Sequence, residues 1–125
     1  RMAIRIEEQK PEIPVEIGKL KFTFKVTDEA VLNFRKESLR LKEELEKIQA
    51  AEDDETNVEK VRELLRQGFD AFLGEGAFEK IYEMSPSVMV ISRYFTQLVL
   101  GISDEIERMG ADKALEKRAK KYLQR

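Results

Sequence analysis

The sequence predicts an α+β fold in which a small N-terminal β-hairpin packs on a body of four to five helices. Two observations support this prediction. Apolar residues alternate with polar ones on both sides of Gly18-Lys19, which is typical of two strands joined by a tight turn. From about residue 27 onward, apolar residues recur at three- and four-residue spacing, which is the period of an amphipathic helix.

The length of 125 residues suits a single domain. Within residues 1–125 we expect a β-hairpin region at 2–26, a helical body at 27–109 and a basic C-terminal helix or tail at 110–125. Arg1 precedes Met2, so we expect Met2 to be the native start.

Two patterns agree on one hairpin register. A Gly at the first position of a two-residue loop favours a type II′ turn, which gives three apolar cross-strand pairs: Ile17 with Leu20, Val15 with Phe22 and Ile13 with Phe24. On the opposite face, the same register pairs opposite charges: Glu16 with Lys21 and Glu12 with Lys25. Pro14 belongs on an edge strand because it has no N–H to donate. Ile4 and Ile6 are candidates for a third strand.

Two long helices are expected next. The first begins near Thr27, the expected N-cap, and carries an apolar stripe at Phe34, Leu41, Leu45 and Ile48. An acidic turn at 52–55 follows; its carboxylates could hold calcium, but the glycine-centred spacing of an EF-hand loop is missing, so we interpret it as a solvated turn. The second helix begins at a capping box, Thr56 to Glu59, and ends before Gly74, which suits a left-handed C′ position.

The second half of the body contains a joint and a long helix. We expect a short helix at about 77–83, then a helix capped by Ser85 with Pro86 at its first position. This helix should run to about Met109, with Gly110 as its stop. It is apolar on more than one face, so we expect it to be the central helix.

Composition excludes several function classes. His and Cys are absent, which removes the common zinc sites and the usual nucleophile–base pairs. We therefore expect no enzyme, no catalytic residues, no metal and no cofactor. The net charge of −2 gives no global basic field for nucleic acid, and the basic residues of the tail are better explained as a solvated helical face. No apolar run reaches the ~20 residues that cross a bilayer, and residues 2–10 are too charged for a signal peptide.

The joint at 74–86 is the most informative region for function. Gly74-Glu75-Gly76 could be a phosphate loop, but it lacks the Lys-Ser/Thr of a P-loop and does not follow a strand. Large apolar side chains lie beside this joint, and methionines and aromatics are adaptable contacts for helical partners. The candidate partner-binding residues are Phe72, Leu73, Phe78, Tyr82, Met84 and Met89. The alternative interpretation places most of them in the core.

Two segments of this chain resemble one protein family. The hairpin segment from Glu16 to Phe24 and the joint from Phe72 to Tyr82 are similar to the tail assembly chaperones of long-tailed, siphovirus-type phages and prophages of Gram-positive bacteria. In that family, a strand pair precedes a helical body with a Phe-Gly-Glu-Gly-type joint. Six residues match the joint: Phe72, Gly74, Glu75, Gly76, Lys80 and Ile81. Leu73 interrupts the match, and Met84-Ser85-Pro86 departs from the Gly-rich continuation of the family.

The resemblance implies a non-enzymatic role. Such a chaperone binds the tape measure protein and keeps it soluble in the host cytoplasm while the tail tube assembles, and it is absent from the mature virion. The tail tube protein is a further candidate partner, and self-association would add avidity. Two alternatives stay open: a structural tail-completion or connector component of the virion, and an enzyme that uses paired carboxylates.

Overall fold

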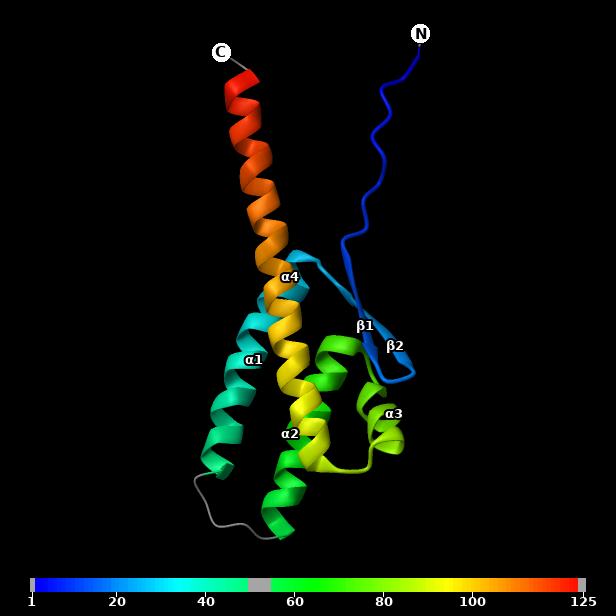
Figure 1. Cartoon of the computed structure of the whole chain (residues 1–125), viewed down its shortest axis with the longest axis vertical. Helices are drawn as coiled ribbons and strands as arrows, with labels where there is room; N and C mark the ends of the chain where they lie inside the picture. The colour runs from blue at the N-terminus through cyan, green and yellow to red at the C-terminus, as the bar shows by residue number, and fades with distance from the viewer. Residues whose placement is uncertain (1, 50–54, 124–125) are drawn as a thin grey trace.

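A computed structural model describes residues 2–49 and 55–123 of the chain. The fold is α+β, as the sequence predicts: a two-stranded antiparallel hairpin packs on helices, of which the described residues contain four (Figure 1). In chain order the elements are β1 (Glu12–Ile17), β2 (Leu20–Lys25), α1 (Asp28–Gln49), α2 (Glu55–Leu73), α3 (Ala77–Met84) and α4 (Val88–Leu123). Residues 52–54 of the expected acidic turn lie outside the described residues.

The hairpin has the predicted register at all six pairs, from Glu12 opposite Lys25 to Ile17 opposite Leu20. Gly18 has a φ of +57°, whereas Lys19 does not have a positive φ. A type II′ turn requires this combination, because only its first central residue is left-handed. The turn chemistry and the alternating pattern therefore determine this element together.

The expected third strand is wrong. Residues 2–11 form no strand. Residues 2–10 extend away from the body, and we call this segment the N-terminal arm (Figure 1). The carbonyl of Pro11 accepts the N–H of Val26 at 2.9 Å, so the arm leaves the body at the open end of the hairpin. Pairing with its own β1 would require the arm to reverse direction, and it does not.

The centre of the fold is α2, which corrects the expectation that the last long helix is central. Helix α2 packs against α1, α3, α4 and β2, whereas α4 packs against α2, α3 and β1. Leu65 and Phe69 of α2 have no exposed surface. Gly68 lets α4 approach closely, because a Cβ at this position would lie 2.5 Å from the Phe95 ring.

Of the three predicted helix caps, one is confirmed and two are wrong. The N–H of Ala30 donates to Oγ1 of Thr27 at 3.0 Å, so Thr27 caps α1 as predicted. Ser87, not Ser85, caps α4, because its Oγ accepts the N–H of Val90 at 3.3 Å. Helix α2 already begins at Glu55, so Thr56 lies inside it and does not precede it as a cap.

Gly110 does not stop α4, which continues to Leu123. The 110–125 region is therefore a continuation of the same helix over its described part and not a separate one. One glycine costs roughly 1 kcal/mol in a helix interior, and the Ala, Lys, Leu and Glu residues that follow favour the helix. The C-terminal part of α4 and the N-terminal arm project from the same end of the body (Figure 1).

Candidate functional site

The predicted joint at 74–86 begins with a tight connection between α2 and α3 and contains α3 itself. Gly74 and Gly76 have φ values of +106° and +88°, which glycine adopts without strain. The carboxylate of Asp70 on α2 accepts the N–H of Phe78 at 3.0 Å, so a side chain from one helix caps the next across the turn. This contact fixes the start of α3 against the end of α2.

The six predicted partner-binding residues divide into three groups. Phe72 and Phe78 are buried and belong to the core, so they offer no surface in this structure, which corrects that part of the prediction. Leu73 and Tyr82 are half-buried. Met84 and Met89 are exposed, at 38% and 68%. The surface that remains available at the joint is therefore formed by the methionines and the open sides of the half-buried pair.

Tyr82 is held in place from α2. Arg62 donates to the Tyr82 hydroxyl at 2.9 Å, and its guanidinium carbon lies 4.9 Å from the centre of the ring, which is a cation–π distance. The Phe78 ring packs against Tyr82 at a centroid distance of 5.7 Å. Tyr82 thus presents one fixed orientation beside the joint.

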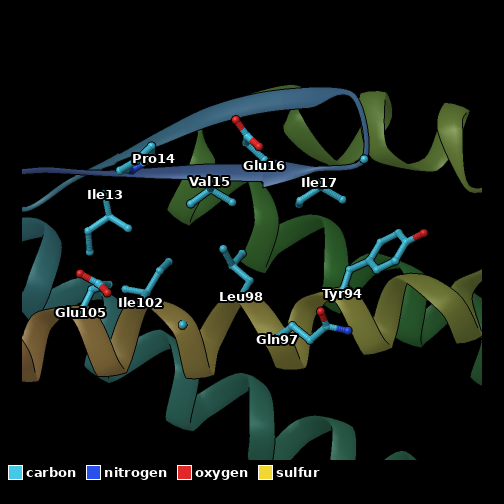
Figure 2. Close-up of a pocket in the computed structure, with 12 residues that line it drawn as sticks. Ile13, Pro14, Val15, Glu16, Ile17, Tyr94, Gln97, Leu98, Ile102 and Glu105 are labelled. Atoms are coloured by element: carbon cyan, nitrogen blue, oxygen red, sulfur yellow. The ribbon is translucent and has the colours of Figure 1, made fainter.

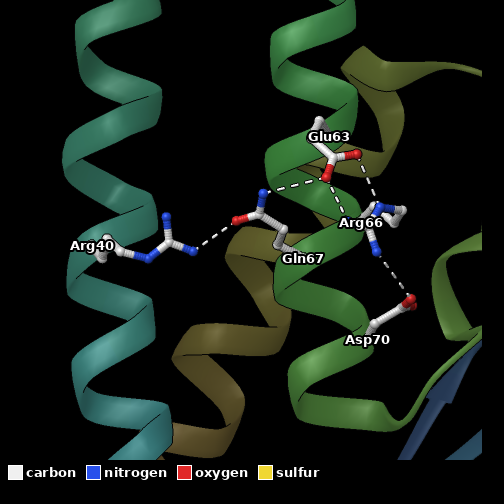
Figure 3. Close-up of polar contacts among 5 residues, drawn as sticks. All are labelled: Arg40, Glu63, Arg66, Gln67 and Asp70. Atoms are coloured by element: carbon white, nitrogen blue, oxygen red, sulfur yellow. Dashed lines mark hydrogen bonds and ion pairs between the residues drawn. The ribbon is translucent and has the colours of Figure 1, made fainter.

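A chain of polar contacts stabilises the outer side of α2 (Figure 3). Arg40 of α1 donates to Gln67 at 2.8 Å, and Gln67 donates to Glu63 at 3.4 Å. Arg66 donates to Glu63 at 2.9 Å and pairs with Asp70 at 3.7 Å. The two hydrogen bonds from Arg66, and then the one from Gln67, lower the pKa of Glu63 to about 2. The network links α1 to the residue that caps α3.

A groove lies between β1 and α4, and we call it the β1–α4 groove (Figure 2). Its volume is about 430 Å³. The β-side is formed by residues 13–18, and the helix side by Tyr94, Gln97, Leu98, Gly101, Ile102 and Glu105. In Figure 2, Ile13, Val15 and Ile17 point from the strand toward the helix. The floor is apolar and is formed by Ile13, Val15, Ile17, Leu98 and Ile102. Glu105 adds a carboxylate on the helix side, whereas Glu16 lies on the opposite face of β1 (Figure 2).

The groove opens along the free edge of β1, since no residue of β2 lines it. Ile17 and Leu20 flank the two-residue turn, and a pair in this position exchanges backbone hydrogen bonds. Every second pair along the hairpin does the same, namely Val15 with Phe22 and Ile13 with Phe24. The backbone groups of Glu12, Pro14 and Glu16 therefore point outward from β1. The sequence predicted that Pro14 lies on an edge strand, but it gave no sign that α4 would pass beside that edge.

The joint and the groove are neighbours. A Cβ at Gly18 in the hairpin turn would lie 2.9 Å from the sulfur of Met84, so the turn packs directly on this methionine. The hydroxyls of Ser85 and Tyr94 are 3.0 Å apart, and Tyr94 lines the groove. Met84 and Ser85 therefore contact two residues that line the groove, Gly18 and Tyr94.

Comparisons with known proteins give one match. A family model described as a family of unknown function (DUF6673) matches residues 18–125. No curated protein and no solved structure matches the chain. Over the described ranges 2–49 and 55–123, no helix is both long enough and apolar enough to cross a membrane.

Proposed function

The chain belongs to the DUF6673 family, a family of unknown function, and we propose that this protein is a non-enzymatic tail assembly chaperone of a long-tailed phage or prophage. It binds the tape measure protein in the host cytoplasm and keeps it soluble while the tail tube forms. The support for this role is the resemblance of the hairpin and of the joint from Phe72 to Tyr82 to such chaperones.

The observation that carries the proposal is the exposed apolar surface just after that joint, where α3 ends and α4 begins. Met84 and Met89 flank the connection between α3 and α4 and are exposed. Methionine is flexible and polarizable, so it can adapt to a long helical partner whose apolar stripe varies along its length. Tyr82, fixed by Arg62, adds a rigid contact beside them.

Co-expression with the tape measure protein encoded beside this chain tests the proposal. We expect a soluble complex, whereas the tape measure protein alone should be insoluble. Met89→Asp should weaken the complex because it places a charge in the apolar contact. Leu32→Asp is the matched control, since Leu32 is equally exposed on α1, and it should leave the complex intact.

Two outcomes would overturn the proposal. The first is a tape measure protein that stays insoluble in the presence of this chain. The second is the recovery of this chain from purified mature virions, which would favour the structural role of a tail-completion or connector component. The tail tube protein, the further candidate partner, can be tested in the same co-expression.

A further inference from the structure

The N-terminal arm exposes three large apolar side chains. Met2, Ile4 and Ile6 are exposed at 93%, 92% and 90%, and they alternate with Ala3 and Arg5 along an extended segment. Burial of such side chains in a complex is favourable, because it removes apolar surface from water. An alternating apolar segment without a partner face has the pattern of a β-strand whose sheet is elsewhere.

The β1–α4 groove has the complementary features. It offers a free strand edge, an apolar floor and a length of six strand residues, about 20 Å at roughly 3.3 Å per residue. The wall at Gly101 is open, because a Cβ there would meet nothing within 4 Å. We propose that the β1–α4 groove receives the N-terminal arm of a second copy of this chain, so that two copies exchange their arms.

The alternation of apolar residues in the arm and in β1 supports an antiparallel exchange. A register with Ile4 opposite Val15 also sets Met2 opposite Ile17 and Ile6 opposite Ile13, so all three apolar arm residues face α4. The arm continues directly into β1 in each chain. Segments 2–17 of the two copies can therefore lie side by side around a two-fold axis, with each arm on the other copy's β1.

Charge and hydrogen bonding agree with this arrangement. The opposite face of the arm carries Arg5, which would lie opposite Pro14 and diagonally between the carboxylates of Glu12 and Glu16. The outward backbone groups of β1 would be paired by the arm, apart from the N–H that Pro14 lacks. Glu7 would face Glu12, a like-charge pair that solvent screens because both side chains are exposed.

Light scattering and sedimentation of the full chain over a wide concentration range test the proposal. The wild type should have twice the chain mass of 14.6 kDa. Ile4→Ser/Ile6→Ser should raise the dissociation constant by at least about 100-fold. Leu32→Ser/Leu39→Ser is the control, because it removes two exposed apolar residues from α1, and it should leave the dimer unchanged. A wild-type monomer at all concentrations would overturn the proposal.

Blocking the groove is an independent test. Gly101 lines the groove, so Gly101→Gln places a side chain in the space that the arm would occupy. Gly110→Gln makes the same change further along α4, outside the groove, where a Cβ would also meet nothing within 4 Å. We expect a monomer for the first variant and a dimer for the second, with equal helix content by circular dichroism. If both variants remain dimers, the arm does not bind in this groove.

A disulfide distinguishes the partner's arm from the chain's own arm. The sequence has no cysteine, so Ile4→Cys/Val15→Cys introduces a unique pair at facing positions close enough to bond. Oxidation should give a covalent dimer, whereas Ala3→Cys/Val15→Cys, with one residue on the opposite face, should not. An intramolecular disulfide would show that each arm folds back on its own β1, and the proposal would be wrong. This result does not depend on binding of the tape measure protein, because that protein is absent from the experiment.

Discussion

The helical body and the N-terminal arm use apolar residues in opposite ways. In the body, α2 buries Leu65 and Phe69 completely, and their neighbours from α1, α3 and α4 close around them. In the arm, Met2, Ile4 and Ile6 remain almost fully exposed. The body buries its apolar side chains on folding, whereas those of the arm stay exposed and would be buried only in the proposed exchange of arms. The difference indicates that stability and self-association can be changed separately in this protein.

Phe95→Ala should have the largest effect on the body. Phe95 is 5% exposed and packs against Phe69 and Phe72 at centroid distances of 5.2 and 6.0 Å. We expect a loss of about 3–5 kcal/mol in the free energy of unfolding, measured by urea denaturation. Leu100→Ala on the exposed side of the same helix should cost less than about 0.5 kcal/mol. Similar losses for both variants would contradict the assignment of the core.

Gly68→Ala should destabilise the protein although alanine is the better helix former. The added methyl group would lie 2.5 Å from the Phe95 ring and 3.0 Å from Leu41, so α2 and α4 would have to move apart. We expect a loss of about 1–3 kcal/mol by the same denaturation. Gly110→Ala, which meets no neighbour within 4 Å, should instead stabilise α4 slightly. A stabilised Gly68→Ala protein would show that the two helices pack less closely.

Glu63→Gln should have a small effect that depends on pH. The folded protein holds the pKa of Glu63 at about 2, below the ordinary glutamate value of 4.5, so the carboxylate stabilises the fold above pH 4.5. This contribution should be lost as the pH falls toward 2, because the proton then binds in the folded state as well. We expect a slightly lower Tm for the variant at pH 7, and a difference that shrinks between pH 4.5 and 2. Added salt should also reduce the difference, because the group is exposed.

The arm variant Ile4→Ser/Ile6→Ser should have the smallest effect on stability. Both side chains are exposed in the single chain, so the free energy of unfolding of the monomer should change by less than about 0.5 kcal/mol. Measurements at several protein concentrations separate this value from the loss of self-association. A large loss of monomer stability would mean that the arm packs on its own chain, and the contrast between arm and body would disappear.

Local patterns in the sequence determined the hairpin and most of the helices. The turn at Gly18 and the alternating residues fixed the register of β1 and β2, because both act between residues that are close along the chain. The cap at Thr27 and the end of α2 before Gly74 follow from the same local chemistry. The partner-binding role of the candidate residues stays a prediction: Met84 and Met89 are exposed and could serve it, whereas Phe72 and Phe78 are buried.

Tertiary structure decided what periodicity could not show. An apolar stripe indicates that a helix has a buried face but not how many neighbours surround it, so the central position of α2 came only from the packing. Ser85 matched a helix cap locally, yet its hydroxyl contacts Tyr94 and Ser87 caps α4. The β1–α4 groove unites residues about 80 positions apart. Such a site depends on how whole elements pack, and no local pattern in the sequence encodes it.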